Sequence, residues 1–307
     1  MKIAFFTEMG FEGKIPRTHI NMRVEFAWMC ALDAYHYSIG TIPSEPYDLA
    51  MVLNSKTKPG LLNIQKLKSK CEIVSILQEG PNWGWQDYAL EHQIHYYNNL
   101  IAADIIYTHN SSDAIYYRGL TNHSDVRVLP SLMIEDNIPK EMDSIKSGVM
   151  VGGNMTSWYG GFDSMVIAQE LGEQIYAPSM GRKIDKEEEL DIIHYPYMDW
   201  TEWITQLNNR RYAVHLMRTH AAGTFALNCA YLGIPCIGYK GLDTQEICNP
   251  ETTVDIGDLK KAREIAKELR NNEKFYLHCS NIAKQKYKEH YHENIFNTTF
   301  KKQFKIP

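Results

Sequence analysis

The sequence lacks the patterns that mark the commonest metal, redox and phosphate-transfer sites. Its six cysteines include no Cys-x-x-Cys pair, and no His-Glu-x-x-His segment is present, which argues against zinc sites built on those spacings. The Gly-x-Gly-x-x-Gly motif of dinucleotide oxidoreductases is absent, and so is the Gly-x-x-x-x-Gly-Lys-Ser/Thr motif of P-loop phosphotransferases. Both enzyme classes are therefore disfavoured.

Long apolar runs are also missing. No uninterrupted apolar stretch approaches the roughly 20 residues that cross a bilayer. Residues 1–8 have a short apolar core and an early acid, unlike a signal peptide, and the N-terminus has no basic amphipathic anchoring helix. The scattered cysteines fit reduced thiols. We therefore expect a cytoplasmic protein with no membrane partner.

The chain has no overall excess of positive charge, but one segment does. The net charge of −5 argues against a uniformly basic coat for nucleic acid. Residues 55–70, however, carry five lysines, among them Lys56 and Lys58, and no acid. Such a run fits either a solvated helix face or a contact with a phosphate backbone.

What is present is a strand and helix pattern that occurs twice. The chain is long for one domain and comfortable for two. In the first half, expected strands at 2–7, 47–53, 72–77, 104–108 and 126–129 alternate with helices at 21–34, 61–70, 86–102 and 112–120. After a proline-flanked linker at 130–139, strands at 148–151, 174–177, 191–195, 212–217 and 236–239 alternate with helices at 162–171, 200–207, 224–232 and 259–270. Two further helices are expected at 275–289 and 294–304. The pattern predicts an N-terminal domain at 1–140, a C-terminal domain at 141–280 and a helical tail at 281–307.

The segment 218–235 is the strongest candidate for a ligand site. An expected strand at 212–217 leads into a polar turn with a glycine, and a helix begins there. Unpaired backbone N–H groups at such a helix start can bind a phosphate, here at Gly223 and Thr224, with Arg218 as a cationic partner. Asn228, one turn later, could reach a ribose hydroxyl. An ordinary strand–helix turn would have the same local pattern.

A second candidate is the loop after the expected strand at 72–77. Glu79 is either a carboxylate tuned as a general base or a solvated loop acid. Trp83 and Trp85 either plug the core or stack on a ligand. Two helical histidines, His92 and His95, have too few partners for metal ligation.

Two segments of the second half resemble the nucleotide-sugar site of GT-B glycosyltransferases. Residues 152–161 (Gly-Gly-Asn-Met-Thr-Ser-Trp-Tyr-Gly-Gly) are similar to that family's glycine-rich strand end. Residues 222–235, with Gly-Ile-Pro at their end and Gln245-Glu246 beyond, are similar to its diphosphate and ribose site. This chain has Asn228 where the family commonly has an acid, and Tyr159 where it commonly has a lysine.

The resemblance implies an α/β fold of GT-B type. In it, two Rossmann-like doubly wound domains face each other across a cleft, and the C-terminal helices pack back toward the first domain. It implies a UDP-sugar donor, no obligatory cofactor and, since no Asp-x-Asp triplet is present, no obligatory metal. The catalytic residues would be Glu79 and Arg218. The implied donor-binding residues are Gly10, Gly153, Asn154, Ser157, Thr219, His220, Gly223, Thr224, Asn228 and Glu246.

A narrower resemblance is to the T-even phage DNA glucosyltransferases. It rests on short matches at residues 9–13 (Met-Gly-Phe-Glu-Gly), Gln78, 103–110, 156–158, 160–162 and 296–304. It implies a monomer that acts in an infected host cell on a hydroxymethylated pyrimidine in duplex DNA, which must be turned out of the stack. The implied acceptor-binding residues are Phe11, Lys14, Arg17, Lys56, Lys58, Trp83 and Trp85. A saccharide or other small acceptor, or a catalytically silent nucleotide-sugar or DNA-binding protein, are the alternatives.

Overall fold

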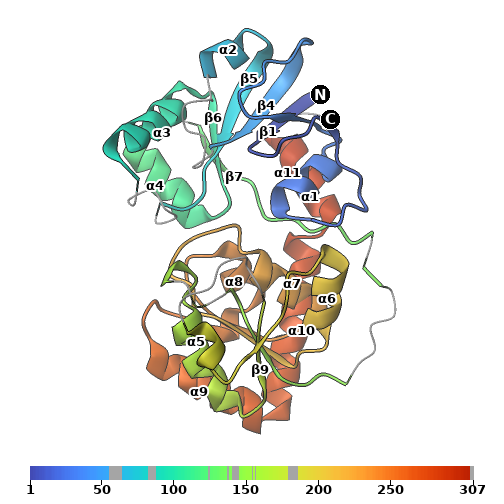
Figure 1. Ribbon diagram of the computed structural model, residues 1–307, viewed down its shortest axis with the longest axis vertical. Helices are drawn as coiled ribbons and strands as arrows, with labels where there is room; N and C mark the ends of the chain where they lie inside the picture. The colour runs from blue at the N-terminus through green and yellow to red at the C-terminus, as the bar shows by residue number, and fades with distance from the viewer. Residues whose placement is uncertain are drawn as a thin grey trace.

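The computed structural model has two lobes, each built around a parallel sheet with helices on both faces (Figure 1). It describes residues 1–54, 64–81, 88–123, 125–136, 138–139, 145–153, 155, 157–178 and 186–304, and of residues 157 and 188 only the backbone. The prediction of two doubly wound α/β domains is confirmed.

The first sheet has seven strands in the order β2-β3-β1-β4-β5-β6-β7. The strands are β1 (Ile3–Thr7), β2 (Gly13–Lys14), β3 (Tyr35–Ser38), β4 (Tyr47–Leu53), β5 (Cys71–Leu77), β6 (Ile105–Thr108) and β7 (Val126–Val128). All pairings are parallel except that of β2 with β3. The helices are α1 (Val24–Ala31), α2 (Ile64–Lys68), α3 (Leu90–Ala102) and α4 (Ser111–Thr121).

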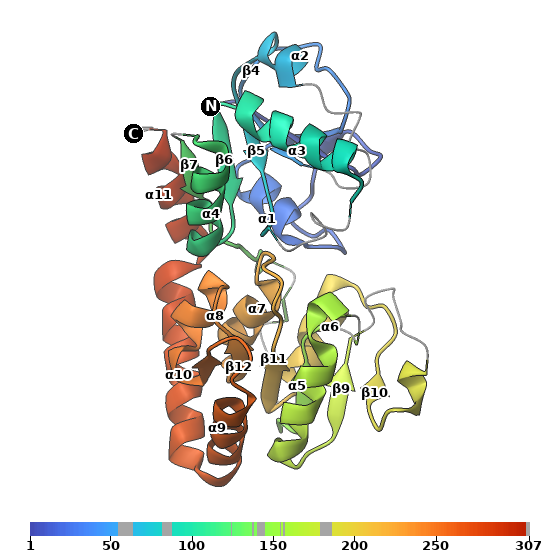
Figure 2. The ribbon, with the colours of Figure 1, turned by 90° about the vertical axis from the view of Figure 1, so that its left-hand side faces the viewer.

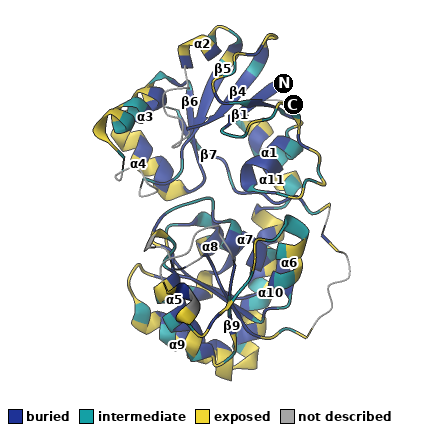
Figure 3. Cartoon of the chain, viewed as in Figure 1, coloured by how far each residue is buried: buried dark blue, intermediate teal, exposed yellow. Residues whose placement is uncertain are grey.

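Buried apolar side chains explain why β1 lies in the interior of this sheet, between β3 and β4. Phe5 packs on one face in a cluster with Trp28, and Phe6 packs on the other face in a cluster with Tyr117. A strand that is covered on both sides contains a nearly continuous apolar run, as β1 does at residues 3–6 and β4 at residues 49–53 (Figure 3).

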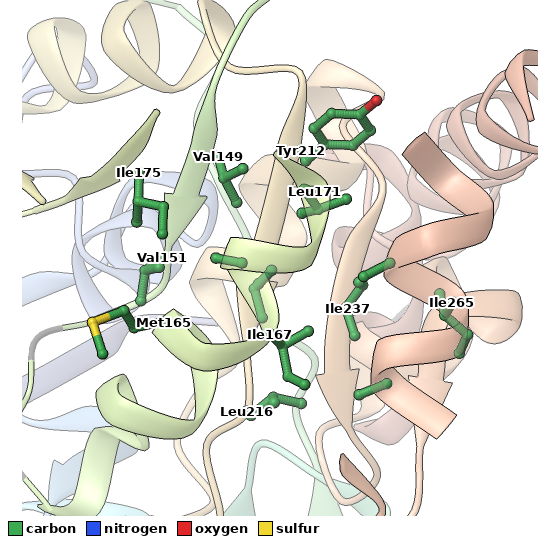
Figure 4. Close-up of a cluster of buried hydrophobic side chains, with 14 of the residues drawn as sticks. Val149, Val151, Met165, Ile167, Leu171, Ile175, Tyr212, Leu216, Ile237 and Ile265 are labelled. Carbon is green, nitrogen blue, oxygen red and sulfur yellow. The ribbon is translucent and has the colours of Figure 1, made fainter. Parts of the chain in front are cut away.

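The second sheet has six parallel strands in the order β10-β9-β8-β11-β12-β13. They are β8 (Val149–Val151), β9 (Ile175–Ala177), β10 (Ile193–His194), β11 (Tyr212–His215), β12 (Cys236–Tyr239) and β13 (Thr253–Val254). Its helices are α5 (Gly161–Ala168), α6 (Trp200–Asn208), α7 (Thr224–Leu232), α8 (Asp243–Cys248) and α9 (Leu259–Asn271). Figure 4 shows the core on one face of this sheet, where Val151, Ile167 and Ile237 lie together.

The last two helices connect the lobes (Figure 2). α10 (Glu273–His290) packs against α7, α8 and α9 of the second lobe. α11 (Glu293–Gln303) returns to the first lobe, where Phe296 and Phe300 are buried and Tyr107 Oη donates to Gln303 Oε1 at 3.0 Å. The predicted return of the C-terminal helices is confirmed. The expected boundary at residue 280 falls inside α10, so the domain limits stay predictions.

Several elements differ from the sequence-based expectation. Strands β2, β3 and β13 and helix α8 were not predicted, because these short segments contain no apolar run like those of the predicted strands. Helix α1 begins at Val24 instead of the expected residue 21. Within the described part of the chain, no helix combines the length and the apolar character needed to span a membrane.

Candidate functional site

A cavity of about 390 Å³ lies between the carboxyl ends of the two sheets. Residues from the loop before α1, the start of that helix and the segment after β5 line its first-lobe side. Loops after β8 and β11, with α6 and the start of α7, line its second-lobe side. Its size is within the range of small-molecule sites, and its position at strand ends is where open α/β sheets bind ligands.

Two glycine turns shape the second-lobe side. Gly153 has φ of +76°, and a Cβ there would lie 2.9 Å from the Tyr159 side chain. Gly223, the N-cap of α7, has φ of +73°, and a Cβ there would lie 2.1 Å from Thr244 Oγ1. Only glycine fits either position.

The start of α7 is suited to an anion. No side chain caps this helix, and Gly223, Thr224 and Phe225 all line the cavity. The unpaired N–H groups of the first turn and the helix dipole favour a phosphate there.

Asn228 is buried on α7 and lines the same cavity. With its amide oriented so that both groups are paired, it donates to the Thr224 carbonyl at 3.2 Å and accepts from Trp203 Nε1 at 3.0 Å. The amide therefore ties α7 to α6. The sequence-based ribose contact stays a prediction, and it would compete with these two bonds.

The first-lobe side carries a charged pair that sequence reasoning missed. Arg23 Nε donates to Glu25 Oε2 at 2.7 Å, and its Nη1 lies 3.6 Å from Glu8 Oε1. Burial alone would raise the pKa of Glu25, but the Arg23 guanidinium outweighs it and holds this pKa below its usual range. Glu79 lines the cavity beside this pair, and its charge contributes to raising the pKa of Arg23 against the effect of burial.

The signal for this pair was present in the sequence. Glu25 is an acid among the apolar residues of α1, between Val24 and Phe26, all three of them buried. An acid on such a helix needs a buried partner, and Arg23 stands two residues before it.

His215 is a second residue that the sequence did not single out. It ends β11, lines the cavity and is 8% exposed. Burial lowers the pKa of its imidazole to about 4, so the ring is neutral near pH 7.

Polar contacts join the two lobes beside the cavity. His220 Nδ1 donates to Asp113 Oδ1 of α4 at 2.7 Å, which raises the pKa of His220. Asn110 Nδ2 donates to the Ala221 carbonyl at 2.9 Å, and Ser111 Oγ donates to Asp243 Oδ2 at 2.7 Å. The turn that leads into α7 is thus fixed to the first lobe.

The structure brings some of the predicted site residues together and places others elsewhere. Five line the cavity: Glu79, Gly153, Gly223, Thr224 and Asn228. The described cavity lining does not include Gly10, Thr219, His220, Glu246 or Arg218. Asn154, Trp83, Trp85, Lys56 and Lys58 lie outside the described residues, as does the side chain of Ser157.

The residues placed elsewhere have other contacts. Arg218 is 62% exposed, and its Nη2 lies 3.2 Å from Asp163 Oδ2. Glu246 Oε1 accepts from the Gly241 N–H at 2.7 Å.

The three described residues of the predicted acceptor face make contacts within the protein. The Phe11 ring packs against the His36 ring at a tilt of 32°, with centroids 4.1 Å apart. Lys14 pairs with Asp33, and Arg17 pairs with both Asp136 and Glu293. Their acceptor role stays a prediction.

Among the described residues, no group of His, Cys, Asp and Glu side chains could hold a metal ion.

Comparison with known proteins identifies the fold. No family model and no curated protein sequence matches the chain. Sucrose-phosphate synthase from Thermosynechococcus elongatus matches with a TM-score of 0.73 and 9% identity, over 99% of this chain and 98% of that one. Anabaena HepE, in complex with UDP and glucose, matches with a TM-score of 0.69 and 9% identity, over 99% of both chains.

Staphylococcus aureus TarM, solved with UDP and α-GlcNAc-glycerol, matches with a TM-score of 0.64 and 11% identity over 83% of this chain. The chain spans about half the length of TarM, 55% of it. Identities this low establish shape and not activity. The chain has the two-domain GT-B fold.

Proposed function

We propose that the protein is a glycosyltransferase that moves a sugar from a UDP-sugar to a hydroxyl group of a saccharide or other small acceptor. The observation that carries the proposal is the cavity between the two sheets, with the uncapped start of α7 and the glycine turn at Gly153 on one side and Glu79 on the other. The complexes of HepE and TarM with UDP support the choice of donor.

The second lobe would hold the donor. The N–H groups at the start of α7 would bind the diphosphate and stabilise the charge that develops on it as it leaves. Arg218 would add a cation from the rim, after giving up its exposed contact with Asp163. Aromatic side chains of Trp203 and Phe225, which line the cavity, offer apolar surface to the nucleoside.

The first lobe would hold the acceptor. In an inverting transfer, Glu79 takes the proton of the acceptor hydroxyl, whose oxygen bonds to the anomeric carbon. The bond from that carbon to the diphosphate oxygen breaks, and the electron pair leaves with UDP. In a retaining transfer no such base is needed, and Glu79 only orients the reacting groups.

A hydroxymethylated pyrimidine in duplex DNA is the second candidate acceptor. One described feature favours it: Lys66, from the lysine-rich segment, is exposed on α2 of the first lobe. The neighbouring Lys68 is partly neutralised by Asp104 at 2.6 Å, which weakens this support. The saccharide acceptor is therefore the primary proposal.

The test is to incubate the protein with a panel of UDP-sugars and, separately, saccharides, unmodified DNA and hydroxymethylated DNA. UDP release and product mass are measured. Sugar added to a saccharide supports the primary proposal, and sugar added only to hydroxymethylated DNA supports the second candidate. UDP binding without turnover on any acceptor would point to a silent binding protein and contradict both. Glu79→Gln should lower turnover with little change in UDP affinity, and wild-type kinetics would remove Glu79 from the mechanism.

A further inference from the structure

His215 stands at the point where the order of the second sheet reverses. Strands β9 and β10 lie to one side of β8, and β12 and β13 lie to the other side of β11. In open α/β sheets the ligand crevice forms at this reversal, between the loops that follow the two central strands. His215 is the last residue of β11, and Gly152 follows the end of β8.

The chain makes room for this imidazole. A Cβ on Gly152 would lie 2.5 Å from His215 Cγ, so the glycine lets the ring lie against the turn after β8. On its other side the ring meets the Phe225 ring of α7 edge-on, with centroids 5.1 Å apart. His215 therefore lies between the turn after β8 and the start of α7, where the diphosphate is proposed to bind.

The imidazole has no hydrogen-bond partner among the described residues. More than nine-tenths of the residue is buried, and its Nε2 is unpaired and sealed from water. The Nδ1 is also unpaired among the described residues but is not sealed, so a ligand in the cavity would meet the ring at Nδ1. His36 Nε2 pairs with Thr7 Oγ1 at 2.9 Å, and His220 pairs with Asp113. Both nitrogens of His109 are buried without a partner as well, but His109 is not part of the described cavity lining, whereas His215 is. A buried ring without a partner is unfavourable for folding, which points to a partner that arrives with a ligand.

We infer that His215 is a donor-positioning residue whose imidazole hydrogen-bonds an oxygen of the bound nucleotide's diphosphate, next to the N–H groups of α7. This inference rests on the proposed function. The ring is uncharged near pH 7 because burial lowers its pKa to about 4, so it acts as a neutral N–H donor. The site combines an uncharged side chain with backbone dipoles, and so needs no buried cation to hold the phosphate.

The experiment compares His215→Leu with His215→Asn, two side chains of nearly equal size and shape. Asn keeps a polar group where the ring Nδ1 stands, and Leu has none. Binding of UDP, UMP and uridine to each full-length protein is measured by calorimetry, and the melting temperature is recorded without ligand. We expect His215→Leu to weaken UDP binding roughly tenfold or more, with a much smaller change for uridine, and His215→Asn to retain most of the affinity.

The unliganded melting temperature separates a binding role from a structural one. His215→Leu should melt at or above the wild-type temperature, because it removes an unpaired buried polar group. Equal UDP binding by wild type and His215→Leu overturns the inference, and so does an equal loss for uridine. If the wild-type protein binds no UDP at all, the proposed function fails first, and the role of His215 fails with it.

Discussion

The two sides of the cavity differ in how they use charge. On the second-lobe side, the described lining is aromatic, apolar or uncharged polar except for Asp199, which caps α6. On the first-lobe side, Arg23, Glu25 and Glu79 lie close together. Backbone dipoles can hold an anion without buried cations, whereas proton transfer needs titratable groups. The difference fits the proposed division of roles, in which the second lobe binds the donor and the first lobe supplies the chemistry.

The largest effect is expected from Gly223→Ala. An alanine would need a left-handed backbone and would place its Cβ 2.1 Å from Thr244 Oγ1. We expect a loss of about 3 kcal/mol in the free energy of unfolding, and UDP binding below detection because the start of α7 moves. Denaturant unfolding and calorimetry measure the two quantities.

Gly10→Ala is the matched control in the first lobe. Gly10 was also predicted to bind the donor, but no atom lies within 4 Å of the Cβ that it would gain. Near wild-type stability and UDP affinity are expected. A loss as large as that of Gly223→Ala would show that the first lobe also holds the donor, against the division of roles.

Arg23→Met should have the next largest effect, because it leaves the buried Glu25 carboxylate unpaired. Because the Arg23 side chain is 35% exposed, we expect a loss of about 2 kcal/mol in the free energy of unfolding, which is less than for a fully buried pair. In the wild type the pKa of Glu25 is lowered, so its contribution is present at neutral pH and lost in acid. In Arg23→Met, burial raises that pKa, and the loss should be larger at pH 8 than at pH 5.

Unfolding at both pH values measures this loss, and Arg23→Met combined with Glu25→Gln should recover part of it. A pH-independent loss would mean that Arg23 acts through packing alone.

Asp113→Asn tests the contact that holds the α7 turn to the first lobe. The hydrogen bond with Asp113 raises the pKa of His220 above the ordinary histidine value of about 6.5. The resulting stabilisation of the folded protein is complete below pH 6.5 and is lost as the pH rises through the raised pKa of His220. The free energy of unfolding of the wild type should exceed that of Asp113→Asn by about 1 kcal/mol at pH 6, and this difference should shrink by pH 9. An advantage that stays constant with pH would exclude the charged pair.

Arg218→Ala should have the smallest effect. The side chain is largely exposed, and exposed ion pairs contribute at most about 1 kcal/mol. We expect unchanged stability and, in calorimetry at low salt, a few-fold weaker binding of UDP. This difference in affinity from the wild type should shrink as the salt concentration rises. A loss of a hundredfold or more would make Arg218 the principal diphosphate ligand and would weaken the contrast between the two sides.

The sequence predicted best what is decided locally. The repeated strand and helix pattern predicted both sheets, and the turn at Gly223 was identified because a glycine at a helix start has a local signature. Gly153 and Glu79 were identified in the same way, as residues that follow a strand.

The features that the sequence did not predict depend on contacts between residues that are far apart in the chain. His220 and Arg218 belong to the predicted segment, but His220 turns to Asp113, over a hundred positions earlier in the chain, and Arg218 turns outward to Asp163. Arg23 and His215 come to line one cavity only when the two sheets face each other, and no local pattern shows which strand ends meet.

A crystal structure of the protein with UDP would show which lobe holds the donor. We expect the diphosphate within hydrogen-bond distance of the backbone N–H groups at the start of α7, between Gly153 and Thr224 and beside His215. A diphosphate held against Arg23 on the first-lobe side, or an empty cavity at saturating UDP, would contradict this expectation.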